Sequence, residues 1–282
     1  MRHSIVDVKT MDSFASGFAG VDKAGDANSF VQYLDLVHSL PFFQECKRLS
    51  YQKLGIVPGA SVLEIGCGNG IDALNLAGMA GPDGHVIGID VSSTMLASAR
   101  ARGETSRGSV DFALCATRFL AFADGSFDAV RTDRVIQHTR DPFSVVREMA
   151  RVTRPSGNVV AFEPDLETFV IWPGERCLTR KALNFWCDRI PSGWVGRSLY
   201  PAFARAGLQE IEVRPVNLVI TDLALAGKIF DLETEVTRAV QDGIIDAGEA
   251  EALVRERVRA DAAGEFFSSL TFYLVSGKKP RE

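Results

Sequence analysis

The sequence predicts a doubly wound α/β fold, in which a mainly parallel sheet carries helices on both faces. Short apolar segments with strand character, such as residues 61–65 and 85–90, alternate with segments of helical periodicity. A glycine-rich turn at residues 66–70 directly follows the first of these strands. Ligands of such sheets bind outside the carboxyl ends of the strands, so this turn lies where a binding site is expected.

The composition is that of a chain with a full hydrophobic core. Of its 282 residues, 46% are hydrophobic and 24% are charged, and the formal net charge is −5. Lysine and arginine are scattered among acidic residues, which argues against a nucleic-acid partner. No apolar run approaches the roughly 20 residues of a membrane span, and the first residues lack the apolar segment of a secretion signal. We therefore expect a cytoplasmic protein without a membrane span.

The cysteine pattern points to reduced thiols. Five cysteines stand at positions 46, 67, 115, 177 and 187, and none forms a CxxC pair. These positions suit neither a zinc site nor an even disulfide framework. The sequence therefore predicts no metal site.

The chain is expected to begin with a loose arm and two helices. Residues 1 to about 20 are polar and contain glycine, which favours an arm. Between Asn28 and Leu54, apolar residues recur every three or four positions, which predicts two amphipathic helices separated near Pro41. We expect residues 1–54 to form this arm and the cap helices, and residues 55–282 to form the main domain.

The central part of the chain follows a regular alternation. Asp141 and Pro142 predict an N-cap and first-turn proline of one helix, and Ser92 or Ser93 predicts the cap of another. Strands are expected at residues 61–65, 85–90, 110–114, 126–133 and 158–164.

The last third of the chain departs from this alternation. Pro215 lacks an N–H, so its strand is expected at a sheet edge, whereas the apolar run 272–275 is typical of a strand buried on both faces. Asp246 and Glu249 predict a capping box that opens a helix in an insertion over the sheet. We expect the buried side of that helix to carry Ala250, Leu253, Val254 and Val258.

The glycine-rich turn excludes two common nucleotide motifs. Gly70 is followed by Ile71 and Asp72 instead of the Lys-Ser/Thr pair of a P-loop. A dinucleotide fingerprint would have its third glycine at position 71, which is isoleucine here.

Four segments then follow one another over roughly residues 55 to 165: "VLEIGCGNG", "VIGIDVSSTML", "FADGSFDAVRTDRVIQHTRDP" and "EMARVTRPSGNVVAFEP". In this order they resemble the motifs of class I S-adenosylmethionine-dependent methyltransferases, most closely those of the ubiquinone/menaquinone methyltransferase branch. The resemblance implies a Rossmann-like sheet of seven strands whose last strand is antiparallel and lies between the fifth and the sixth. It also implies methyl transfer from S-adenosyl-L-methionine to a small organic acceptor, leaving S-adenosyl-L-homocysteine.

The resemblance also assigns cofactor-binding roles. Asp90 would accept hydrogen bonds from both ribose hydroxyls, since a carboxylate has two acceptor oxygens. Glu64 would help to hold the ammonium group of the cofactor, or else it pairs with a nearby arginine. The other residues expected at the cofactor are Gly66, Gly68 and Gly70 under the methionyl and ribosyl parts, Val91 and Met95 at the adenine, and Asp133 and Arg134 at the methionyl end.

One position departs from the family pattern. Cys115 stands where many relatives have an aspartate that accepts from the adenine amino group, and a thiol is a weak acceptor. We therefore expect the main chain around Ala116 and Thr117 to contact the adenine.

Candidates for catalysis lie near the strand ends. His138 follows the fourth strand and is the candidate general base, although a structural role is the alternative. Glu163, at the tip of the fifth strand, and Tyr33, in the N-terminal helices, are further candidates for contact with the acceptor.

Acceptor specificity is expected from the N-terminal helices and from cap segments at about 165–200 and 221–265, which would act as a lid. Their aromatic residues favour a partly apolar acceptor such as a secondary metabolite or quinone-like compound, or else form a packed lid core; they include Trp172, Phe185, Trp186 and Trp194. Two alternatives remain. One is a protein or cyclase that binds the cofactor without methyl transfer, and the other is arsenite methylation through Cys46, Cys177 and Cys187.

Overall fold

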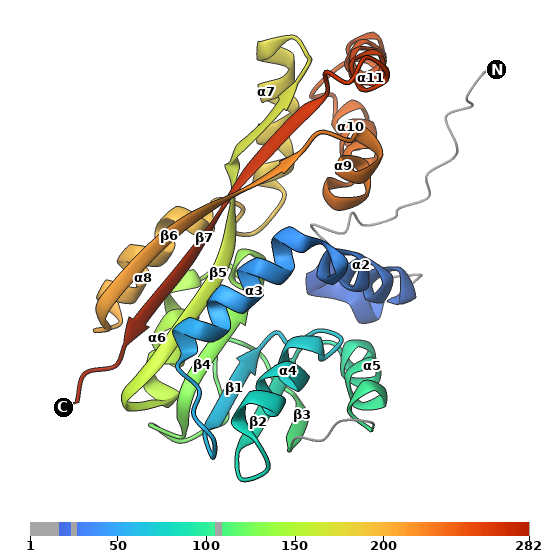
Figure 1. The fold of residues 1–282 in the computed structure, drawn as a ribbon. Helices are drawn as coiled ribbons and strands as arrows, with labels where there is room; N and C mark the ends of the chain where they lie inside the picture. Colours follow the sequence, from blue (N-terminus) through green and yellow to red (C-terminus); the bar gives the residue numbers. More distant parts are fainter. Residues whose placement is uncertain (1–16, 24–26, 105–108, 282) are drawn as a thin grey trace.

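The computed structural model describes residues 17–23, 27–104 and 109–281. These residues form one seven-stranded sheet, in the order β3-β2-β1-β4-β5-β7-β6 (Figure 1). Strand β7 is antiparallel to both of its neighbours, as predicted. The strands are β1 (Ser61–Ile65), β2 (His85–Asp90), β3 (Val110–Leu114), β4 (Phe127–Asp133), β5 (Thr153–Trp172), β6 (Gln209–Ile220) and β7 (Phe267–Lys278). The predicted fold class is confirmed.

Helices cover both faces of the sheet. Successive strand residues point to opposite faces, so Val62 joins the core under α3 and α4 while Leu63 joins the core under α6 and α8. The α-helices are α2 (Ala27–Ser39), α3 (Pro41–Leu54), α4 (Ile71–Ala80), α5 (Ser93–Gly103), α6 (Pro142–Val152), α7 (Arg176–Asp188), α8 (Leu199–Arg205), α9 (Leu223–Phe230), α10 (Leu232–Gln241) and α11 (Ala247–Ala262). Three short 3-10 helices are η1 (Phe18–Lys23), η2 (Ile136–His138) and η3 (Val195–Ser198).

The predicted helix boundaries have the expected local causes. The Ser92 side chain caps α5 by accepting from Met95 N, and the Asp141 side chain caps α6 by accepting from Ser144 N at 3.1 Å. Asp246 and Glu249 form both bonds of the capping box at α11. Pro41 lies at the first turn of α3 and separates it from α2.

Both strand placements predicted for the last third are confirmed. Strand β6, which contains Pro215, lies at the sheet edge. Strand β7 lies between β5 and β6, and its residues Leu274 and Val275 are buried. Proline is tolerated at this edge because only one side of β6 pairs with another strand.

The fifth strand is longer than predicted. It continues past residue 164 to Trp172 and pairs with β7, so the cap segment expected from about residue 165 begins as strand. Phe169 and Ile171 are buried while Val170 is exposed, an alternation typical of a half-buried strand. Together with β6 and β7, this extension carries α7 and α9–α11 beyond the carboxyl ends of the central strands (Figure 1).

The predicted buried side of α11 is partly wrong. Val254 and Val258 are 41% and 53% exposed. The helix buries Ala250, Leu253, Arg257 and Ala260, whose spacing follows one face at 3.6 residues per turn.

The expected N-terminal arm falls largely outside the described residues, which begin at residue 17. Its last residues belong to η1, however, and Val21 there is buried. Within the described ranges, every helix is too short or too polar to cross a membrane.

Candidate functional site

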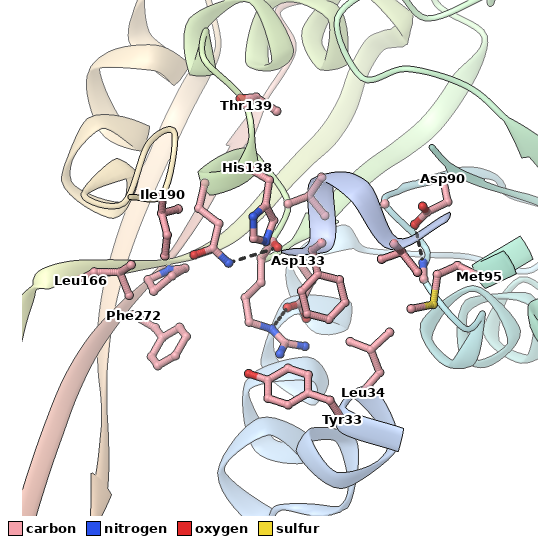
Figure 2. Close-up of a pocket in the computed structure, with 18 of the residues that line it drawn as sticks. Tyr33, Leu34, Asp90, Met95, Asp133, His138, Thr139, Leu166, Ile190 and Phe272 are labelled. Carbon is pink, nitrogen blue, oxygen red and sulfur yellow. Dashed lines mark hydrogen bonds and ion pairs between the residues drawn. The ribbon is translucent and has the colours of Figure 1, made fainter. Parts of the chain in front are cut away.

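A cavity of about 340 Å³ opens at the carboxyl ends of the central strands. Figure 2 shows Asp90 and Met95 on one side of it and Leu166, Ile190 and Phe272 on the other, with Tyr33 and His138 between them. The cavity therefore has a polar end at the first strands and an apolar end toward the cap.

The glycine-rich turn forms the floor of the polar end. Gly66, Gly68 and Gly70 have φ values of 68°, 52° and 83°, in the region that L side chains rarely adopt. Gly66 and Gly68 line the cavity. Gly70 does not; a Cβ there would lie 2.7 Å from the Ala99 Cβ, so this glycine allows α5 to pack closely. In the structure Gly70 thus has a packing role against α5.

Asp90 ends β2 beside this turn. One of its carboxylate oxygens accepts from Gly68 N and the other from Ser92 N, both at 2.9 Å. Burial raises the pKa of Asp90 above its ordinary value. Val91, Met95 and Thr117 line the cavity next to it, whereas Ala116 does not. The strand end thus presents a carboxylate already oriented by two backbone N–H groups.

A buried ion network lies beneath the cavity. Arg131 is fully buried and donates to Glu64, to Asp133 (Nη2 to Oδ2, 2.6 Å) and to Ser50 Oγ (2.8 Å). Burial raises the pKa of Glu64 to about 8 even though Arg131 opposes that change. Of the two roles expected for Glu64, the structure shows the pairing with an arginine, Arg131. Glu64 does not line the cavity.

Asp133 and Arg134 line the middle of the cavity. The Arg134 Nε donates to Asp133 Oδ1 at 2.7 Å, and its guanidinium lies 4.8 Å from the ring centroid of Phe43. Burial would raise the pKa of Asp133, but the two arginines outweigh burial and lower it. Arg134 has a φ of 57°, a strained conformation for a residue other than glycine that is often found at functional sites.

His138 and Tyr33 also line the cavity. Burial lowers the pKa of His138 to about 4, so its imidazole is neutral near pH 7. Its Nδ1 is buried and has no hydrogen-bond partner among the described residues. The Tyr33 hydroxyl donates to Ile229 O at 3.2 Å, which ties α2 to α9 across the cavity.

Glu163 lies behind the cavity wall and does not line it. One of its carboxylate oxygens accepts from Val135 N at 2.8 Å and from Ile136 N at 2.7 Å. Burial raises the pKa of Glu163 to about 8. In the structure Glu163 therefore holds the turn that leads to His138, from behind the cavity wall.

Comparisons with known proteins agree with this geometry. The sequence model of a family described as a methyltransferase domain matches residues 62–157. The chain carries a class I methyltransferase domain. The family predicted from the four motifs is thereby confirmed.

Two curated relatives illustrate the range of similarity of this methyltransferase. An uncharacterized 37.1 kDa protein in transposon TN4556 of Streptomyces fradiae is 35% identical over 246 residues, which cover 87% of this chain and 70% of the relative. The demethylmenaquinone methyltransferase of Lactococcus lactis is 34% identical over 122 residues, or 43% of this chain and 48% of that enzyme.

A solved structure shares the fold of this methyltransferase. Phosphoethanolamine N-methyltransferase 2 from Haemonchus contortus, in complex with S-adenosyl-L-methionine, matches with a TM-score of 0.60 at 19% identity. The match covers 96% of this chain and 61% of that one.

The aromatic residues expected around the acceptor are only partly correct. Of the four, only Trp186 lines the cavity; Trp172 and Trp194 are 61% and 53% exposed, and Phe185 packs against the small core of α10 and α11. The other rings at the cavity of this methyltransferase are Phe18, Tyr33, Phe43, Phe230 and Phe272. Phe43 and Phe272 stand in segments that the sequence already marks as buried, but nothing local distinguishes cavity from core.

The cysteines do not assemble into a site. Cys115 lies outside the cavity lining, and its Sγ is 3.5 Å from the Ala116 carbonyl oxygen. Cys46 and Cys187 are buried, and burial raises the pKa of each thiol to about 12, whereas Cys177 is exposed. No group of three metal-ligating side chains occurs within the ranges the structure covers, so the three thiolates needed for arsenite do not converge.

Proposed function

We propose that this protein transfers a methyl group from S-adenosylmethionine to a small, partly apolar organic acceptor. The observation that carries the proposal is the continuity of one cavity, from the Asp90 carboxylate at its polar end to the rings of Phe43 and Phe272 at its apolar end. A cofactor with a charged head and an acceptor of different polarity would meet between these ends.

The polar end fits the cofactor by its chemistry. Gly68 N and Ser92 N each donate to one carboxylate oxygen of Asp90 and so orient the group. Each oxygen keeps lone pairs that can accept from the ribose hydroxyls. Gly66 and Gly68 leave the floor without side chains, and Val91 and Met95 provide an apolar wall for the adenine. Asp133 and Arg134 stand where the methionyl group would end, while Thr117 is the residue that lines the cavity near the adenine.

When bound, the cofactor supplies a methyl group on a sulfonium. The reaction is an in-line displacement, so the chain has to align the acceptor, keep the reacting atoms roughly 3 to 3.5 Å apart and exclude water. His138 is neutral near pH 7 and borders both ends of the cavity, so we propose that it accepts the proton of a hydroxyl or activated carbon on the acceptor.

The cap would select the acceptor. We propose that residues 1–54 and the segments at about 165–200 and 221–265 act as the lid of the methyltransferase domain. Tyr33, Leu166, Trp186, Ile190 and Phe230 from these segments line the apolar end, which suits an aromatic or quinone-like molecule.

Isothermal titration with S-adenosylhomocysteine tests the cofactor site. The wild type is expected to bind, and Asp90→Ala to bind about 100-fold more weakly or worse, since two charge-assisted hydrogen bonds are lost. Asp83→Ala, which changes an exposed aspartate in the turn before β2, is the control and should bind like the wild type.

Release of S-adenosylhomocysteine in a screen of aromatic acceptors then tests methyl transfer. Tight binding of the cofactor without turnover on any acceptor would favour a non-methylating protein such as a cyclase. Binding of a nicotinamide dinucleotide instead of the adenosyl compound would refute the proposal altogether.

A further inference from the structure

The short helix η1 covers the cofactor end of the cavity. Phe18 and Val21 line the cavity. Val21 packs with Met95 and Phe30, and its side chain is only 2% exposed. The Phe18 ring centroid lies 5.8 Å from that of His138. Residues of η1 therefore reach from the adenine wall to the candidate base.

One carboxylate attaches η1 to the body of the domain. Asp22 accepts from the Ser92 hydroxyl, from Ser93 N and Oγ at 2.8 Å each, and from Thr94 N at 3.1 Å. These donors form the first turn of α5, where the helix dipole favours a negative charge. The hydrogen bonds from Ser92 and Ser93 lower the pKa of Asp22, so it is ionised throughout the neutral range.

Asp90 also contacts the first turn of α5, because its carboxylate accepts from Ser92 N. Ser92 thus lies between the residue that closes the cavity and the residue proposed to hold the ribose. Within η1, Gly20 interrupts the helical geometry with φ −140°, and no atom outside its chain neighbours lies within 4 Å of the position that a Cβ would take.

We propose that Asp22 is a positioning residue that latches η1 over the bound cofactor, so that the cofactor leaves only when this carboxylate releases α5. This inference rests on the proposed function and adds to it a residue outside the four sequence motifs. Asp22 is exposed, so water competes for its hydrogen bonds and the latch can open without unfolding the domain.

Stopped-flow dissociation of S-adenosylhomocysteine tests the latch. We expect Asp22→Ala to raise the dissociation rate about fivefold to tenfold, in line with the loss of a helix cap, and to change the association rate less. Ser93→Ala removes one of the four bonds and is expected to have a smaller effect. Lys23→Ala, a change of the neighbouring exposed charge, is the control and should match the wild type.

Two further measurements separate a latch from a general loss of structure. The thermal midpoint of unliganded Asp22→Ala is expected to lie within about 4 °C of the wild type, as for the loss of one helix cap, while trypsin should cleave after Lys23 faster in the variant. Equal dissociation rates in a wild type and variant that both bind would overturn the latch and leave the proposed function standing. A wild type that binds no S-adenosylhomocysteine would overturn both.

Discussion

The floor of the cofactor end comes from consecutive elements, whereas the apolar end collects side chains from across the chain. Gly66 and Gly68 lie in the turn between β1 and α4, and Asp90 ends β2. The rings at the apolar end come from five separate elements: Tyr33 in α2, Phe43 in α3, Trp186 in α7, Phe230 in α9 and Phe272 in β7.

This contrast teaches that the two ends can vary independently. The cofactor end depends on backbone conformation and one carboxylate, so nearly any change there affects every acceptor equally. The apolar end depends on the packing of side chains from α7, α9 and β7, which do not contribute to the polar floor, so we expect changes there to alter the acceptor without loss of the cofactor. Mutations that affect one end and spare the other sharpen this comparison.

The largest loss of stability is expected from a change of Arg131, which lies beneath the cavity where its two ends meet. Arg131 connects Ser50 on α3 to Glu64 on β1 and Asp133 on β4. Arg131→Met leaves the buried Glu64 without its arginine and removes one of the two arginines that pair with Asp133. We expect the free energy of unfolding to fall by about 3–5 kcal/mol in urea titrations.

Arg154→Met is the matched control for this change, because Arg154 is 57% exposed and pairs with Asp128 at the surface. It should cost about 1 kcal/mol or less. A similar cost for both variants would mean that the buried network does not hold the two ends together.

His138 provides the next test. His138→Asn is expected to lower kcat about 100-fold with the best acceptor of the screen, since it removes the proposed base, while the affinity for S-adenosylhomocysteine changes less than about threefold. Because burial lowers the pKa of His138 to about 4, the acid limb of kcat/KM is expected near pH 4. An unchanged kcat would assign His138 to the scaffold.

The lowered pKa of His138 also predicts that the stability of the protein depends on pH. Between pH 4 and the ordinary histidine value of 6.5, the unfolded chain binds a proton at His138 that the native protein does not. Stability should therefore fall as the pH drops through this window. Urea titrations at pH 7.5 and pH 4.5 should show a smaller fall in His138→Asn than in the wild type.

The smallest effect is expected at Glu163. Glu163→Gln keeps one side-chain oxygen, which can accept from both Val135 N and Ile136 N, so we expect kcat to fall only about threefold to tenfold and the free energy of unfolding to change by about 1 kcal/mol. Steady-state kinetics and urea titrations measure both. A loss of kcat as large as that of His138→Asn would return Glu163 to direct contact with the reacting groups.

Local chemistry accounts for the predicted features that the structure contains. The glycines of residues 66–70, the carboxylate of Asp90 and the caps of α5 and α6 act on their immediate neighbours in the chain. The edge position of Pro215 follows from its missing N–H. Each of these depends on backbone geometry that a short segment specifies by itself.

Other residues have roles that depend on a distant partner. Glu64 faces Arg131 and Gly70 faces Ala99, so neither lines the cavity although both stand in the expected motif. Trp172 and Trp186 are equally aromatic, but the extension of β5 turns Trp172 outward while α7 buries Trp186. The sequence alone therefore determined the sheet, the family and the polar floor, because these follow from local periodicity and turn chemistry. Only the tertiary structure decided which rings line the apolar end and that Asp22 joins η1 to α5, because those contacts connect segments that are far apart in the chain.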